Sequence, residues 1–161
     1  MKIFTVLALI LCSLPAFAFD YSQFYDCAPN VAPETIDLII QVESGGHPFA
    51  LNVNGYDSFY PDSADESYEL ANYFISKGYS VDIGLMQINS KNLSWLGYTV
   101  SDCYDPCLNI SMGGIILSDN YQRALGVYRN PQRALVAALS AYNTGSFNAG
   151  IYSGYVSKYY K

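Results

Sequence analysis

Residues 32–46, APETIDLIIQVESGG, decide the fold of this chain. Pro33 suits the first position of a helix, and Glu34 adds an acid in the first turn. Three isoleucines and then Glu43 follow at the helical spacing i, i+3, i+4 and i+7, and a pair of glycines ends the predicted helix. The apolar face of this helix therefore ends in a carboxylate.

A carboxylate at the end of an apolar stripe has to be explained, because burial penalises its charged form. Either Glu43 is paired with another group, or its pKa is raised so that it can act as an acid. Glycoside cleavage requires a protonated carboxylic acid beside the scissile oxygen. We therefore take Glu43 as the candidate catalytic acid, the alternative being an acid at a surface helix end.

The rest of the chain predicts a mostly α-helical domain. A second helix is expected from Ser63, which forms a capping box with Glu66, to just before Gly78. Further helices are expected at about 107–124 and 131–142, and the only strand candidates are short and lie around 81–88. No repeat or long linker divides the chain, so we predict a single domain whose loops carry the polar residues.

Residues 1–18 are predicted to be a secretory signal peptide. A positive start, an apolar stretch over 3–14 and the small-x-small site at 16–18 (AFA) follow in the expected order. The apolar run is too short for a transmembrane helix. A lipid anchor at Cys12 is the alternative, although a leucine precedes that cysteine. Cleavage leaves the domain at 19–161, with no stable membrane insertion.

The charge and the residue composition of the chain limit the classes of partner and cofactor that it is expected to bind. The net charge is −6, and no basic run is present, which argues against nucleic acid and anionic membrane surfaces. Sixteen tyrosines suit either sugar stacking or core packing. Export permits a disulfide among Cys27, Cys103 and Cys107. With His47 as the single histidine, no metal site and no cofactor are expected.

Two further segments combine polar and apolar side chains, at 82–89 (DIGLMQIN) and 141–145 (AYNTG). The amides of Gln87, Asn89 and Asn143 are candidates to bind the acetamido and hydroxyl groups of amino sugars.

These segments carry a family resemblance. In order, ESGG, GLMQIN and AYNTG resemble the lysozyme-like fold of lytic transglycosylases, and the chain is most similar to the subfamily associated with type IV secretion and conjugation. That subfamily is indicated by residues 27–35 (CAPNVAPET), 51–54 (LNVN) and 105–110 (DPCLNI). The resemblance implies a mainly α, lysozyme-like α+β domain with a small, irregular β element beside the active-site cleft.

The resemblance also implies roles for single residues. Glu43 matches the catalytic acid and base, and Ser44 would orient its carboxyl group. Tyr142 matches a tyrosine that hydrogen-bonds near the catalytic Glu. The expected substrate-binding residues are Gln87 and Asn143 in the cleft, Asn89 beside them, and Met86 as an apolar floor, with plain core packing as the alternative for Met86.

The sequence allows two roles for Asp82. The stretch 81–90 also resembles hen-type lysozyme, in which an Asp at this place serves as nucleophile. Lytic transglycosylases generally use the Glu alone, with help from the substrate's acetamido group, and the muramyl 6-hydroxyl attacks instead of water. Asp82 therefore keeps hydrolysis open, whereas the alternative is a surface Asp that caps a turn.

Relatives often carry a second cysteine pair at the places of Asn120 and Ala141. Its joint absence favours a bridge between Cys27 and Cys107 with Cys103 left over, the alternative being a bridge between Cys103 and Cys107.

The function implied is a periplasmic lytic transglycosylase. It would cleave the β-1,4 bond between N-acetylmuramic acid and N-acetylglucosamine, leave 1,6-anhydromuramyl ends, and open the wall locally for a type IV secretion or conjugation apparatus. Its partners would be peptidoglycan glycan strands and type IV secretion components. The alternatives are a muramidase that uses Glu43, Asp82 and water, and a non-catalytic glycan-binding subunit, which would have no need of a buried acid.

Overall fold

The computed structural model describes residues 20–159, so the predicted signal peptide lies outside the described residues. The helices and strands are, in order, η1 (Ser22–Cys27), α1 (Pro33–Glu43), β1 (Leu51–Val53), β2 (Ser58–Phe59), α2 (Ala64–Ser76), β3 (Val81–Ile83), β4 (Ile88–Asn89), η2 (Ser90–Asn92), α3 (Leu93–Leu96), η3 (Ser101–Tyr104), α4 (Pro106–Tyr128), α5 (Pro131–Thr144), α6 (Ala149–Tyr152) and η4 (Val156–Tyr159). The prediction of a mainly helical domain with a small β element is confirmed.

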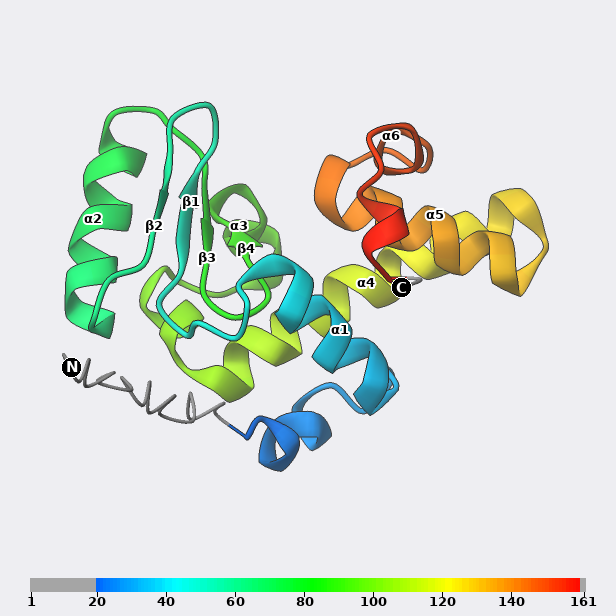
Figure 1. Ribbon diagram of the computed structural model, residues 1–161, viewed down its shortest axis with the longest axis horizontal. Helices are drawn as coiled ribbons and strands as arrows, with labels where there is room; N and C mark the ends of the chain where they lie inside the picture. The colour runs from blue at the N-terminus through cyan, green and yellow to red at the C-terminus, as the bar shows by residue number, and fades with distance from the viewer. Residues whose placement is uncertain (1–19, 160–161) are drawn as a thin grey trace, which may run out of the picture.

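The molecule consists of a small sheet and a group of helices. Figure 1 shows the sheet and α2 at one end, α5 and α6 at the other, and α1 and α4 between them. The strands are antiparallel in the order β2-β1-β3-β4. Residue 82 of β3 pairs with residue 52 of β1 and with residue 89 of β4, which brings three polar side chains together on one face.

The expectation that strands lie only around 81–88 was incomplete, because β1 and β2 precede α2. Three residues in β1 and two in β2 are too few to show a clear alternation in sequence. What makes them strands is pairing: β1 pairs with β3, whose residues are about 30 positions away, and β2 pairs with β1. The helix boundaries agree within a few residues, apart from α4, which runs on to Tyr128.

Helix α1 packs as its sequence predicts. The three isoleucines of α1, Ile36, Ile39 and Ile40, are buried in the main core. Gly45 and Gly46 follow the helix with positive φ angles of 62° and 84°, which glycine adopts without strain. Glu43 is therefore the last residue of a helix that is fixed by its apolar face.

A disulfide holds the start of this helix to the body. Cys27 and Cys107 are bonded across a separation of 80 residues and join η1 to the first turn of α4, while Cys103 is free and buried. This is the pairing that the sequence favoured. Within 20–159, no helix is long and apolar enough to cross a membrane.

Candidate active site

Two adjoining hollows form one cleft between the sheet and the helices. Both are lined by the same central residues: Glu43, Asn52, Asp82, Gln87 and Asn143. The larger hollow, about 520 Å³, continues past Asn92 of η2 and Ile116 of α4. The smaller hollow, about 210 Å³, continues past Tyr60 and Lys158. The cleft therefore runs in two directions from the candidate acid.

Glu43 is a half-buried acid at the centre of this cleft. The pKa of its carboxyl group is raised to about 7, with burial as the largest cause and the negative charge of Asp82 as a smaller one. A hydrogen bond from Tyr155 and the charge of Lys158 act in the opposite direction. An acid with a pKa near neutrality is suited to giving and taking a proton at working pH.

Tyr155 is the partner of this acid that the sequence reading missed. Its hydroxyl donates a hydrogen bond to Oε1 of Glu43, and the hydroxyl of Tyr159 lies 2.5 Å from that of Tyr155. Because the Tyr155 proton is directed at the carboxyl group, Tyr159 is the donor in the second bond. The two tyrosines form a relay that ends at Glu43, and burial raises the pKa of both phenols above the ordinary value of 10.

Ser44 does not contact the Glu43 carboxyl group, contrary to the role expected for it. The buried Ser44 hydroxyl donates to the carbonyl of Ile40 at 3.1 Å and accepts from the backbone N–H of Gly46 at 3.2 Å. Ser44 therefore caps the end of α1 and fixes the turn after it. Its influence on the acid passes through the backbone.

Tyr142 and Met86 contact each other beside the cleft. The Tyr142 hydroxyl donates to the backbone carbonyl of Met86 at 2.8 Å and so holds the β3–β4 connection near Glu43. The Met86 side chain is fully buried, and its sulfur lies against Gly113 of α4. Met86 is thus a core residue, as in the alternative given for it, and does not form the floor of the cleft. Tyr142 itself lines the larger hollow.

Asp82 is held in the cleft by three asparagine amides. Asn52 and Asn54 donate to one carboxylate oxygen at 3.0 and 2.9 Å, and Asn89 donates to the other at 2.6 Å. Asp82 lines both hollows and therefore does not cap a surface turn. Asn89 was expected to bind sugar, but its amide nitrogen donates to Asp82 and its amide oxygen accepts from the backbone N–H of Lys91.

Gln87 presents an acceptor to the cleft. Its amide nitrogen donates to the backbone carbonyls of Ala50 and Gly84 at 3.1 and 2.9 Å, which uses both amide hydrogens. The oxygen Oε1 is left to accept from a ligand N–H or O–H. Asn143 is exposed, lines both hollows and has no side-chain hydrogen bond within the described part of the chain, so its whole amide is available.

A buried asparagine shapes the connection that carries Gln87. Asn109 of α4 donates to the carbonyls of Ile83 and Cys103 at 3.0 and 2.8 Å and accepts from the N–H of Met86 at 2.8 Å. Gly84, at φ 78°, lies so close to Asn109 that a Cβ atom would collide with it. The sequence reading quoted this residue within 105–110 but gave it no role.

Among residues 20–159, no group of three or more His, Cys, Asp or Glu side chains is placed to bind a metal ion. His47 instead makes edge contacts with the rings of Phe49 and Tyr60.

A helical domain with a small sheet, and a carboxylic acid facing a carboxylate across an amide-lined cleft, defines the lysozyme-like class of proteins. The Transglycosylase SLT domain model matches residues 20–160, and the chain belongs to this family. The type IV secretion system protein virB1 of Brucella suis biovar 1 is 42% identical over 126 residues, covering 77% of this chain and 53% of that protein.

Protein virB1 of Agrobacterium fabrum is 38% identical over 135 residues, covering 83% of this chain and 54% of that protein. The chain spans about half the length of the curated relatives it matches. No solved structure gave a significant match.

Proposed function

We propose that this protein is a periplasmic lytic transglycosylase that cleaves the β-1,4 bond between N-acetylmuramic acid and N-acetylglucosamine in peptidoglycan. The observation that carries the proposal is the position and the pKa of Glu43, about 7, at the centre of an amide-lined cleft. Near neutral pH such an acid is protonated in a large share of molecules and can donate to the scissile oxygen.

The chemistry needs one acid that later acts as a base. Glu43 protonates the leaving oxygen as the glycosidic C–O bond breaks and positive charge develops at the sugar C1. The carboxylate of Glu43 then takes the proton of the muramyl 6-hydroxyl, and the oxygen of that hydroxyl bonds to C1. The 1,6-anhydro ring closes without water, and Glu43 is protonated again.

Other cleft residues act around this proton transfer. The carboxylate of Asp82, fixed by three amides, stabilises the positive charge at C1 electrostatically. Tyr155 positions the carboxyl group of Glu43. The free Oε1 of Gln87 and the amide of Asn143 bind the acetamido and hydroxyl groups of the sugar rings.

The setting of the activity is inferred from relatives and from the start of the chain. The matched relatives from Brucella are named type IV secretion system proteins, which supports local opening of the cell wall for a secretion or conjugation apparatus. The predicted signal peptide over residues 1–18 supports a periplasmic location.

The products of digested sacculi test the proposal. Mass spectrometry should show muramyl ends lighter by one water than those of a muramidase, and Glu43→Gln should lower their release by roughly 10²–10⁴-fold. Predominantly hydrated ends that disappear in Asp82→Asn would instead identify a muramidase. Binding of sacculi without release of any fragment would identify a glycan-binding subunit.

A further inference from the structure

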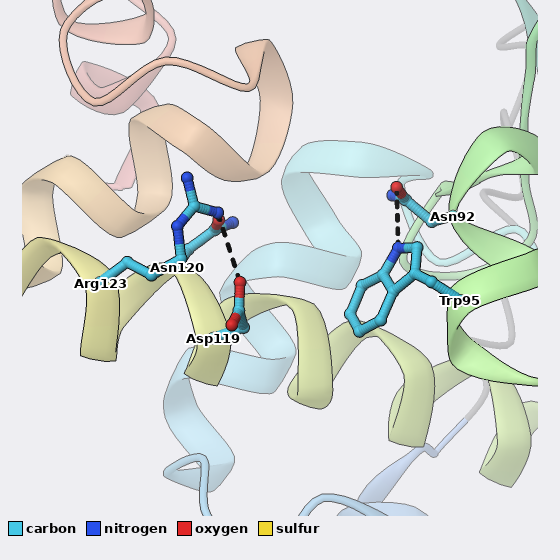
Figure 2. A network of polar contacts seen from close by, with 5 residues as sticks. All are labelled: Asn92, Trp95, Asp119, Asn120 and Arg123. Carbon is cyan, nitrogen blue, oxygen red and sulfur yellow. Dashed lines mark hydrogen bonds and ion pairs between the residues drawn. The ribbon is translucent and has the colours of Figure 1, made fainter.

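Trp95, the single tryptophan of the sequence, lies on α3, three residues after Asn92, which lines the larger hollow. Its side chain is 55% exposed although the neighbouring Leu93 is buried in the core. The indole N–H donates to Oδ1 of Asn92 at 3.3 Å, and Asn92 lines the cleft. Figure 2 shows the ring standing away from the α3 ribbon beside Asn92.

Trp95 differs from other exposed aromatic residues in its lack of contact with another ring. The exposed tyrosines of the sheet region contact one another or Phe74, with ring centroids 5.1–6.0 Å apart for Tyr56, Tyr73 and Tyr79. Trp95 has no such ring contact within residues 20–159. A large exposed indole that is fixed at one edge by a hydrogen bond presents a rigid flat surface to a ligand.

The opposite wall at this end of the cleft is α4. Ile116 lines the larger hollow, and Asn120 and Arg123 lie four and seven residues further along the same side of the helix. Arg123 bonds to Asn120 at 3.4 Å and forms an ion pair with Asp119 at 3.3 Å. Figure 2 shows Asp119, Asn120 and Arg123 on α4, and Asn92 and Trp95 on the neighbouring segment.

We propose that Trp95 and Asn92 form a sugar-binding subsite that extends the cleft between α3 and α4. The indole stacks on the apolar face of an N-acetylhexosamine ring, and the free amide nitrogen of Asn92 donates to a hydroxyl or acetamido oxygen of that sugar. The inference rests on the proposed function, because the ligand is a distant unit of the same glycan strand. Two observations support the subsite: Asn92 lines the cleft, and the apolar indole of Trp95 lies next to the Asn92 amide.

The single tryptophan makes the subsite directly observable. Glu43→Gln protein, which does not cleave its ligand, is titrated with β-1,4-linked N-acetylglucosamine oligomers of two to six units. Tryptophan emission and calorimetry are followed together. We expect the hexamer to change the emission saturably, with the same dissociation constant by both methods. The dimer should bind weakly, because it contacts fewer residues along the cleft.

Variants in the same background separate stacking from structure. Trp95→Ala should weaken hexamer binding about tenfold, the loss typical of an aromatic anchor, and Trp95→Phe should recover part of it. Tyr152→Ala removes an aromatic side chain that is 88% exposed and outside the cleft, and should bind as its parent does. Circular dichroism checks that each variant is folded.

Two results overturn the inference, and they differ. In the first, calorimetry shows that the hexamer binds Trp95→Ala as tightly as its parent, and the tryptophan emission of the parent does not change on binding. This result contradicts the subsite but not the proposed function. The absence of any calorimetric binding, together with wild-type protein that releases no fragments from sacculi, contradicts the proposed function and the subsite with it.

Discussion

The pKa of Glu43 is set by groups whose removal should shift it in opposite directions. The hydrogen bond from Tyr155 lowers this pKa, and the charge of Asp82 raises it. The acid must be protonated to start the reaction, so kcat/KM should fall as the pH rises through the pKa of about 7. For wild type the activity should be about tenfold lower at pH 8 than at pH 6.

Tyr155→Phe should move this basic limb to higher pH. A hydrogen bond to a carboxylate contributes more than one to a neutral acid, by about 1 kcal/mol, and only this difference alters the pKa. That corresponds to a rise of about 0.7 pKa unit. Normalised to its own maximum, the variant should therefore keep about four times more activity than wild type at pH 8. Its maximum should be lower, because the carboxyl group is less well oriented.

Asp82→Asn should move the same limb to lower pH, because a neutral amide no longer disfavours the Glu43 carboxylate. Tyr159→Phe is the matched control. It retains the Tyr155 hydroxyl and removes only the donor behind it, so its limb should shift much less than that of Tyr155→Phe. Release of soluble fragments from sacculi between pH 5 and 9 gives the profiles. An unmoved limb in Tyr155→Phe, or shifts of the same sign in Tyr155→Phe and Asp82→Asn, would refute this account of the acid.

Two predictions concern the support of the site, both measured by urea unfolding. Asn109→Asp should lower the free energy of unfolding by roughly 2–4 kcal/mol, because a carboxylate oxygen would face the buried carbonyls of Ile83 and Cys103. Asn120→Asp keeps an oxygen that accepts from Arg123 and should cost much less, and equal losses would contradict this role for Asn109. Replacing Cys27 and Cys107 together by Ser opens a bridge across 80 residues and should cost roughly 4–5 kcal/mol in the chain-entropy model, whereas stability equal to that of a Cys103→Ala control would show that the bridge does not hold the helix start.

The sequence was most informative where local pattern and chemistry coincide. The isoleucine stripe, the terminal carboxylate and the two glycines of α1 are all contained in fifteen residues, and their periodicity predicted both the helix and the acid. The capping box before α2 worked for the same reason, since the Ser63 hydroxyl accepts from the N–H of Glu66.

The residues that the sequence reading missed act across long separations. Tyr155 reaches Glu43 over 112 positions, and nothing distinguishes it locally from fifteen other tyrosines. Asn52 and Asn54 reach Asp82 only because β1 pairs with β3. Ser44 and Met86 were given the wrong contacts because their positions in a motif do not reveal the direction of a side chain.

The dependence of Glu43 on distant residues ties its chemistry to the docking of the last described segment. Tyr155 and Val156 are buried, and η4 packs against α1, so this segment both covers the acid and supplies its hydrogen bond. The two contributions oppose each other, since burial raises the pKa of Glu43 and the tyrosine lowers it. Burial is the larger, so undocking η4 would return the pKa toward the ordinary value of 4.5 and leave the carboxyl group ionised at neutral pH. We therefore expect the ability of Glu43 to act as an acid to depend on the docking of this segment.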